Sequence, residues 1–326
     1  MSLHGPRTLL LEAREVPLGG VRAMSVRRTL PHRDVPTIGA WCFLDRFGPD
    51  EVRMRVEPHP HIGLQTVTWP LAGEIRHRDT LGSDVVLHRG QLDLMTAGRG
   101  IAHSEYSVGD GPIPLDALQF WVALPDGARD GAPGFEQHTR LPALTLPATD
   151  GPDAAAVVVL GTLAGVRSPA TVHTPIVGAE IRLEPGARVS VPLASDWEHA
   201  VLVVEGDARV DAVEVPHGEM LFLGDSREDV EVTTTDGALL FLLGGEPFAQ
   251  DLVMWWNFAA RTHEEIVQAR EDWESEGVAA DDAVPDAAEP SVAVTRRFGP
   301  VVGHGPERIP APPIPPVRLM PRRRRV

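Results

Sequence analysis

Two pairs of potential metal ligands occur at alternate positions in short stretches of the chain. His59 and His61 lie in PHPHIGLQTV, residues 58–67, and His103 and Glu105 repeat the spacing in TAGRGIAHSEY. Successive side chains of a β-strand point to opposite faces, so residues i and i+2 share one face, about 6.6 Å apart along the backbone. Two such strands, side by side in a barrel, would bring three imidazoles and one carboxylate to a common centre.

These residue types favour a divalent transition metal at an open site. Imidazole nitrogens suit Fe, Ni, Cu, Co and Zn, and a carboxylate lowers the net charge of the site. The single cysteine, Cys42, disfavours a closed structural zinc site built from thiolates. A metal that prefers five or six ligands would keep positions open for a substrate or dioxygen. The alternatives are an incidental His-x-His pair and a purely structural metal, but burying these groups without partners would be costly.

The surrounding sequence alternates short apolar runs with glycine and proline, which is typical of short β-strands joined by turns. The 326 residues include 31 glycines and 31 prolines, and apolar runs such as ALQFWVALP (117–125) and HAVLVVEGD (199–207) have the length of buried strands. A stretch rich in Gly, Pro and Asp follows Pro125, so we place a domain boundary near residue 140. The sequence therefore predicts an all-β protein with two domains.

The second half of the chain echoes the first. In the first half, a strand is followed by a hairpin and then by HRGQLDLM. In the second half, VLVVEGD is followed by PHGEMLFL in the same way, and the hairpin between these two segments is slightly shorter. This offset places Pro192 and Ala194 opposite the first histidine pair. The second copy is thus predicted to keep the scaffold without the metal ligands. Its histidines, His199 and His217, are predicted to be surface or turn residues.

One amphipathic helix is predicted near the end of the chain. Thr262 and Glu265 have the spacing of a capping box, and apolar residues then follow a helical period over residues 262–275. The acidic, proline-rich segment beyond, which ends in RRRRV, is predicted to be extended or disordered unless it lies on a partner or on the protein's own core. We divide the chain into a metal-binding domain, a second domain without metal, the helix and a tail: residues 1–140, 141–260, 261–275 and 276–326.

Composition excludes several classes of function. Forty-six acidic and 30 basic residues give a formal net charge of -16, which argues against direct binding of nucleic acid. One cysteine excludes an internal disulfide and fits a reducing compartment. No segment has the roughly 18 uninterrupted apolar residues of a membrane span. We expect a cytoplasmic monomer that does not bind membranes.

The stretches HPHIGLQTVTWPLAGEIRHRDTLGSD and MTAGRGIAHSEYS resemble the signature of the pirin family, two-domain members of the cupin superfamily. The resemblance continues through LDALQFWVALP, FLLGGEPF and WWNFAARTHEEIVQAR, and covers roughly residues 15–275. It implies two tandem cupin (jelly-roll-like) β-barrels with a short C-terminal helix. It further implies one metal in the first barrel, with Fe(II) expected and Mn, Co, Ni or Cu as alternatives, and no metal in the second. The implied metal ligands are His59, His61, His103 and Glu105.

The family resemblance implies two kinds of function. Some bacterial members resemble quercetin 2,3-dioxygenases, which bind a flavonol at the metal, remove a proton from its hydroxyl and open its ring with O2. Glu105 would then be the catalytic base. Other members are implied to be non-catalytic, metal-dependent partners of proteins such as transcription regulators. We favour the enzyme, and note that Gln65 stands where many members carry a glutamate in the HPH-x-G-x-E stretch.

Two further pairs of residues in the first half of the chain are lower-ranked candidates for the site. His77 and Arg78 lie in a strand near a hairpin, and we interpret them as structural or surface residues. Gln119 and Trp121 share one face of a strand, where they either pack in the core or line a cavity.

Overall fold

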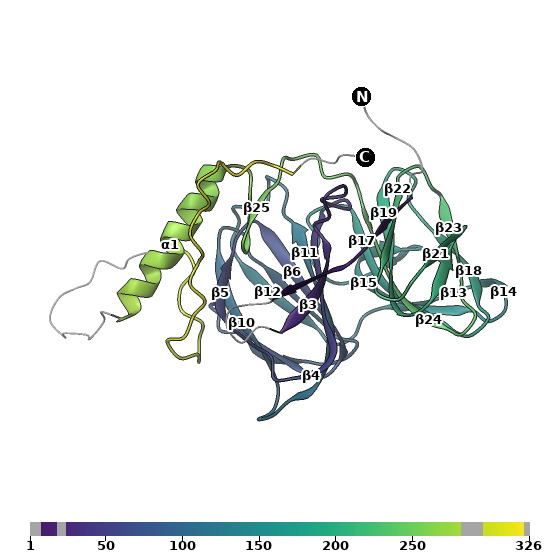
Figure 1. The fold of residues 1–326 in the computed structure, drawn as a ribbon, viewed down its shortest axis with the longest axis horizontal. Coiled ribbons are helices and arrows are strands. Elements are labelled where there is room, and N and C mark those ends of the chain that lie inside the picture. Colours follow the sequence, from purple (N-terminus) through teal and green to yellow (C-terminus); the bar gives the residue numbers. More distant parts are fainter. Residues whose placement is uncertain (1–7, 18–23, 282–295, 323–326) are drawn as a thin grey trace.

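The computed structural model describes residues 8–17, 24–281 and 296–322 (Figure 1). Residues 282–295 and 323–326 of the predicted tail lie outside this part of the chain. The described residues form two β-barrels and one helix, α1 (His263–Asp281), which confirms the predicted fold class. None of the helices in the described ranges is long and apolar enough to cross a membrane.

The first barrel consists of two antiparallel sheets. A seven-stranded sheet has the order β12-β9-β6-β11-β4-β3-β2, and a four-stranded sheet has the order β5-β10-β7-β8. The strands are β2 (Arg14–Pro17), β3 (Ser25–Leu30), β4 (Trp41–Val52), β5 (Arg55–His61), β6 (Leu64–Ala72), β7 (Ile75–Asp79), β8 (Asp84–Leu87), β9 (Leu92–Thr96), β10 (Ile101–Ser107), β11 (Ile113–Ala123) and β12 (Gly134–His138).

The second barrel also consists of two sheets. An eight-stranded sheet follows β1-β22-β19-β24-β17-β15-β13, with β16 paired to β15, and a five-stranded sheet follows β14-β18-β23-β20-β21. The strands are β1 (Leu9–Leu11), β13 (Ala143–Leu146), β14 (Ala148–Asp150), β15 (Ala154–Leu163), β16 (Val166–Arg167), β17 (Ile176–Leu183), β18 (Arg188–Pro192), β19 (Glu198–Gly206), β20 (Ala208–Val210), β21 (Val213–Val215), β22 (Met220–Gly224), β23 (Asp229–Thr233) and β24 (Ala238–Gly245).

The two barrels share one topology, as the internal repeat predicts. Strands β9-β6-β11-β4-β3 of the first large sheet correspond in order to β22-β19-β24-β17-β15 of the second, and β5-β10-β7-β8 correspond to β18-β23-β20-β21. One exchange breaks the symmetry. The N-terminal strand β1 pairs with β22 of the second barrel, in the place that β12 occupies beside β9 in the first. Residues 9–11 are therefore part of the second barrel, although they come before the first barrel in the sequence.

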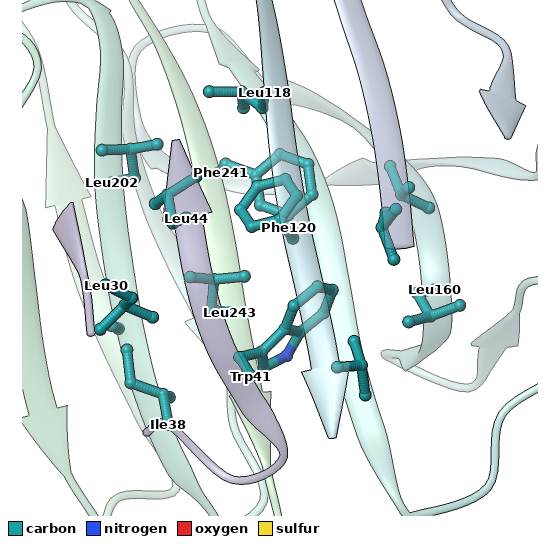
Figure 2. Packing of buried hydrophobic residues seen from close by; sticks show 14 of the residues in the cluster. Leu30, Ile38, Trp41, Leu44, Leu118, Phe120, Leu160, Leu202, Phe241 and Leu243 are labelled. Atoms are coloured by element: carbon teal, nitrogen blue, oxygen red, sulfur yellow. The ribbon is translucent and has the colours of Figure 1, made fainter. Parts of the chain in front are cut away.

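A hydrophobic layer joins the large sheets of the two barrels (Figure 2). Residues of strand β11 alternate across this layer: Leu118 and Phe120 face the second barrel, whereas Gln119 and Trp121 face a cavity inside the first. Trp41 completes the junction, since its Nε1 lies 3.2 Å from the carbonyl of Val177 and 3.1 Å from that of Gly244. The layer includes Leu30, Ile38, Trp41, Leu44, Leu118, Phe120, Leu160, Leu202, Phe241 and Leu243.

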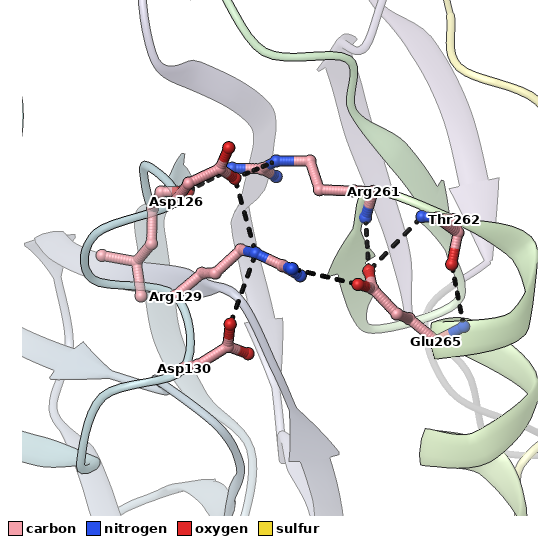
Figure 3. A network of polar contacts seen from close by, with 7 residues as sticks. Asp126, Arg129, Asp130, Arg261, Thr262 and Glu265 are labelled. Carbon is pink, nitrogen blue, oxygen red and sulfur yellow. Dashed lines mark hydrogen bonds and ion pairs between the residues drawn. The ribbon is translucent and has the colours of Figure 1, made fainter.

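Helix α1 begins with the predicted capping box (Figure 3). The backbone N–H of Glu265 donates to Thr262 Oγ1 over 3.2 Å, and that of Thr262 donates to the Glu265 carboxylate over 3.3 Å. The same carboxylate accepts a bond from Arg129, in the loop after β11, and Arg261 donates to Asp126 in that loop. These contacts attach the start of the helix to the first barrel.

The helix ends later than the sequence predicts. It continues past residue 275 to Asp281. The Glu276 carboxylate accepts hydrogen bonds from the backbone N–H groups of residues 297–299, which fixes this turn to the tail. Gly277 leaves room for a side chain of the tail, because a Cβ there would stand 2.3 Å from Arg308 Nη1.

Tail residues 296–322 form no helix or strand but lie along α1 and the first barrel (Figure 1). Phe298 is buried against Phe258 and Trp273. The Ile309 N–H donates to the carbonyl of Pro58, and the Ile309 carbonyl accepts from Trp273 Nε1. The tail is thus extended on the protein's own core, one of the outcomes that the composition allowed.

Candidate metal centre

The four predicted ligands come from two paired strands of the first barrel. His59 and His61 end β5, His103 and Glu105 lie in β10, and the antiparallel register places His103 opposite His59. All four side chains are buried, yet all line one cavity of about 340 Å³. The i, i+2 spacing therefore has the effect that the sequence predicts: it turns both pairs into the same cavity.

The three imidazoles form a compact triad. Their ring centroids lie 4.4 to 5.0 Å apart, and Nε2 of His61 is 3.1 Å from Nε2 of His103. Two imidazole nitrogens bound at neighbouring positions, each about 2.1 Å from a metal, stand about 3.0 Å apart. One nitrogen from each of the three rings lies within 4.8 Å of the others. This spacing fits a single transition-metal ion.

The outer nitrogens of the first pair are held by carbonyl groups. His59 Nδ1 lies 2.8 Å from the carbonyl oxygen of Glu57, and His61 Nδ1 lies 3.1 Å from that of Asn257. A carbonyl only accepts hydrogen bonds, so each neutral ring carries its proton on Nδ1. Each Nε2 then presents a lone pair to the cavity, which is the tautomer that a metal requires.

The third imidazole is supported by a further histidine. Nδ1 of His103 lies 3.4 Å from Nδ1 of His77, whose Nε2 lies 3.2 Å from the Asp79 carboxylate. The His77 ring stacks on Phe135, with centroids 4.4 Å apart. If Nε2 of His77 donates to Asp79, its Nδ1 accepts the proton of His103, and Nε2 of His103 is available to a metal.

Burial keeps the triad neutral. It lowers the pKa of His59 to about 4, against an opposing effect of the Glu57 carbonyl, and holds the pKa values of His61 and His103 well below 6.5. Neutral imidazole is the form that binds metals. At neutral pH the three nitrogens therefore need not lose protons before they bind a metal.

Glu105 lines the same cavity but stands apart from the triad. Among the described residues, the group of side chains close enough to share an ion consists of the three histidines alone. Glu105 Oε1 lies 3.3 Å from Thr68 Oγ1, which in turn lies 3.0 Å from Gln119 Oε1. Burial raises the pKa of Glu105. The structure thus places this carboxyl group beside the triad, in an environment suited to proton transfer.

A second buried carboxyl group lies behind the cavity and has no counterpart in the sequence prediction. Asp93 of β9 is 3% exposed, and neither carboxylate oxygen has a hydrogen-bond partner of normal geometry among the described residues. Burial raises the pKa of Asp93 to about 7, and the charge of Glu105 adds to this rise. Its only sequence signal is an aspartate inside the apolar strand QLDLMT.

Local backbone geometry explains the glycine that follows the histidine pair. Gly63 has a φ of +68°, and a Cβ at this position would stand 2.1 Å from the carbonyl oxygen of Ala259. Its N–H donates to Gly98, and its carbonyl accepts from Leu124. The turn after HPHI therefore requires glycine. It brings β26 (Phe258–Ala260) against the end of the strand that carries the histidines.

The cavity walls come from distant parts of the chain. The predicted pair Gln119 and Trp121 lines the cavity, and Trp121 stacks on Phe43 with centroids 3.9 Å apart. The hairpin of β25 (Val253–Trp255) and β26 closes one side, although the sequence assigned these residues to the second domain. The lining residues that sequence reasoning missed are Pro17, Arg28, Pro31, Phe43, Asp45, Phe47, Val56, Met254, Trp255, Trp256, Asn257, Ile309 and Arg322.

His77 and Gln65 show what the sequence left open. His77 is a buried structural residue, and with Asp79 it repeats the i, i+2 spacing of the ligand pairs, a signal that could have identified it. Gln65 points away from the metal cavity. Its amide nitrogen donates to Thr96 Oγ1 over 2.9 Å and to the carbonyl of Thr171, in the second half of the chain, over 3.2 Å. Its role is therefore at the contact between the barrels.

The second barrel carries valine where the first carries the candidate ligands. In the strands that correspond to β5 and β10, the buried inward pairs are Val191 with Val230 and Val189 with Val232. Pro192, which the repeat offset placed opposite a ligand, is exposed one position away from this inward face. The prediction that His199 is a surface or turn residue is wrong, because it lies buried in β19.

His217 does lie exposed in a turn, as predicted.

Fold and site together define a two-barrel cupin protein with a histidine-lined cavity in its first barrel. Residues 21–122 match the Pirin family profile, and residues 178–279 match that of the Pirin C-terminal cupin domain. The chain belongs to the pirin family.

Relatives cover nearly the whole chain. "Putative quercetin 2,3-dioxygenase PA1205" of Pseudomonas aeruginosa is 38% identical over 307 residues, which span 93% of this chain and 89% of that protein. Human Pirin is 30% identical over 258 residues, 75% of this chain and 84% of that protein. The crystal structure of a quercetin 2,3-dioxygenase from Acinetobacter baumannii has a TM-score of 0.83 at 34% identity, and the match covers 96% of this chain and 97% of that one.

Proposed function

We propose that this protein is a metal-dependent dioxygenase of the quercetin 2,3-dioxygenase type, which opens the ring of a flavonol-like substrate with O2. One observation carries the proposal: three neutral imidazoles present Nε2 to a cavity that also contains a carboxyl group of raised pKa. The names of the relatives from Pseudomonas aeruginosa and Acinetobacter baumannii support the same reaction class.

The residues that would hold the metal are His59, His61 and His103, and we propose Fe(II) as the ion. Glu105 lies outside this group but lines the same cavity, and it would be a fourth ligand that leaves the metal when it acts as a base. The donor set fits such an ion because each ring has its outer nitrogen engaged and its inner nitrogen facing the cavity. When bound, the metal would supply Lewis acidity toward a substrate hydroxyl and a site for dioxygen chemistry. Thiolates play no part, since Cys42 is buried and turned to the Trp121 carbonyl.

The cavity itself would bind and orient a flat aromatic substrate. Its volume of about 340 Å³ lies at the small end of ligand pockets, which run from about 300 to 1,000 Å³. Aromatic rings line it on two sides, with Trp121 and Phe43 on one and Trp255 and Trp256 on the other. A planar ring system between them would be shielded from water.

Glu105 would accept the proton of the substrate hydroxyl. A carboxylate in a buried site is a stronger base than one in water, because burial disfavours its charge. The new carboxylic acid could donate to Thr68 Oγ1, whose own proton is then directed to Gln119 Oε1. This chain of contacts gives the proton a defined position at Oε1 of Glu105.

Oxygen uptake tests the proposal. Fe(II)-loaded protein should consume O2 with quercetin. Glu105→Gln should slow turnover by roughly 100-fold or more, the size of a lost general base. His103→Ala should lose both metal and activity, and His217→Ala, an exposed change in the second barrel, should alter neither. Undiminished turnover by Glu105→Gln would remove the base. No uptake by the metal-loaded wild type would favour the alternative, a non-catalytic metal-dependent interaction protein.

A further inference from the structure

A second cavity lies at the mouth of the second barrel. Its volume is about 760 Å³, and it is bordered by the ends of β15, β17, β18 and β19. Leu163, Val177 and Leu242 belong to its lining and to the apolar core of that barrel. Trp197 is half-buried at its edge. The cavity therefore has an apolar floor and an aromatic side chain at its entrance.

The ionisable groups in the lining of this cavity are all basic side chains. Its lining includes Arg167, His173 and His199 and, among the described residues, contains no aspartate or glutamate. A neighbouring cavity of about 600 Å³ shares Arg167 and adds Arg140, again without a carboxylate from the described ranges. The chain as a whole has 46 acidic residues and a net charge of -16. A large cavity without acidic groups is thus a local exception on an acidic protein, and it favours an anionic guest.

Both guanidinium groups are available to a ligand. Neither Arg140 nor Arg167 forms an ion pair with any residue that the structure describes, and both are exposed. Other arginines of the same barrel are engaged: Arg188 pairs with Glu231, and Arg209 with Glu214. An unpaired arginine at a cavity mouth is suited to bidentate binding of a carboxylate.

His199 adds a polar group within the cavity wall. The side chain is 1% exposed, and its Nδ1 has no hydrogen bond of normal geometry to a described residue. Burial lowers its pKa to about 4, with opposing contributions from the Trp197 carbonyl and from the charge of Asp196 nearby, so the ring is neutral at pH 7. A neutral imidazole can donate one hydrogen bond and accept another.

We propose that the second barrel binds a small aromatic carboxylate at this cavity, separately from the metal centre. The ring would lie on the apolar floor beside Trp197, and the carboxylate would pair with Arg167 at the mouth. The inward valines of this barrel cannot bind a metal, so the proposed ligand would contact the protein alone. The site does not depend on the dioxygenase reaction of the first barrel.

Calorimetric titration of metal-free protein tests this site. The probe is 4-hydroxybenzoate, and 4-hydroxybenzamide is its uncharged analogue of nearly equal shape. We expect the acid to bind and the amide to bind at least about tenfold more weakly, since charge-assisted bonds are the stronger ones. Arg167→Gln should weaken the acid by a similar factor. Arg188→Gln, on the outside of the same barrel, is the matched control and should leave binding unchanged.

Two further variants locate the binding. Ala194→Trp fills the rim of the second cavity and should abolish binding, whereas His59→Ala, in the first barrel, should preserve it. Loss of binding in His59→Ala would place the probe at the metal centre and overturn the proposal. Equal binding of acid and amide, an unchanged Arg167→Gln variant or no binding of the acid by the wild type would overturn it as well. None of these outcomes depends on oxygen uptake, so this site and the proposed reaction can fail independently.

Discussion

Replacing His77 should weaken metal binding without touching a ligand. His77 contributes the acceptor that faces Nδ1 of His103, at 3.4 Å, and its ring fills space against Phe135. His77→Phe keeps the aromatic ring and removes the acceptor. The Nδ1 proton of His103 is then buried without a partner, and the tautomer with its proton on Nε2, which cannot bind a metal, becomes competitive.

The expected loss follows from the geometry. Removing the partner of a metal-bound histidine costs roughly 10- to 100-fold in metal affinity. The contact between His103 and His77 is long, at 3.4 Å, whereas the contact that supports His59 measures 2.8 Å. We therefore expect the lower end of that range, about tenfold, or about 1.4 kcal/mol. His77→Asn is the matched control, since its side-chain oxygen can replace Nδ1 as the acceptor.

Competition between the protein and a chelator for Fe(II) or Co(II) measures the effect. Unfolding of the metal-free variants in urea shows whether the fold is retained. The expected order of affinity is wild type, then His77→Asn within about threefold, then His77→Phe about tenfold weaker. If His77→Phe binds metal as tightly as the wild type, or if His77→Asn loses as much as His77→Phe, the hydrogen bond to His103 does not orient the ligand.

Three other predictions concern stability. Trp41→Phe should cost about 1–3 kcal/mol in urea unfolding, because the carbonyls at the barrel junction lose their donor; an unchanged midpoint would contradict this. The pKa of His199 is about 4 in the folded chain and about 6.5 in the unfolded chain. Between these values the unfolded chain binds the extra proton, so stability falls as the pH drops from about 6.5 to 4. The loss due to His199 is up to about 3 kcal/mol. His199→Gln should make that part of the stability curve less steep, while His59, His61 and His103 still contribute to it. Parallel curves would refute the assignment. Phe298→Ala should remove about 3 kcal/mol of tail packing and speed proteolysis within residues 296–322, followed by mass spectrometry; equal cleavage rates would show that the ring does not hold the tail.

The sequence could predict that the three histidines come together, because the signal is local. His59 and His61 share a strand face by the period of the pleat, and the same holds for His103 in its own strand. The sequence did not show directly that the two strands that carry these histidines pair with each other. The capping box of α1 was predictable for the same reason, since Thr262 and Glu265 make contact within one turn.

Features that depend on tertiary contacts could not be predicted. Gln65 has the sequence position of a site residue, but strand alternation turns it toward Thr171 and the junction of the barrels. His199 has the polarity of a surface residue, yet it is buried because β19 lies between two other strands of its sheet. The end of α1 depends on residues 297–299, which donate to Glu276 from a distant segment. No local pattern contains these partners.

The segments at the two ends of the chain each pack on the barrel that is more distant in the sequence. Strand β1, at the N-terminus, pairs with β22 of the second barrel, while the β25–β26 hairpin and the tail, which follow the second barrel, close the metal cavity of the first. The Asn257 carbonyl of that hairpin accepts the bond that orients His61, so even a candidate metal ligand depends on a residue beyond the second repeat. Each barrel is therefore completed by a segment from outside its own repeat. Because an apolar layer also joins their large sheets, we expect the histidine-lined cavity of the first barrel to depend on the folding of the second.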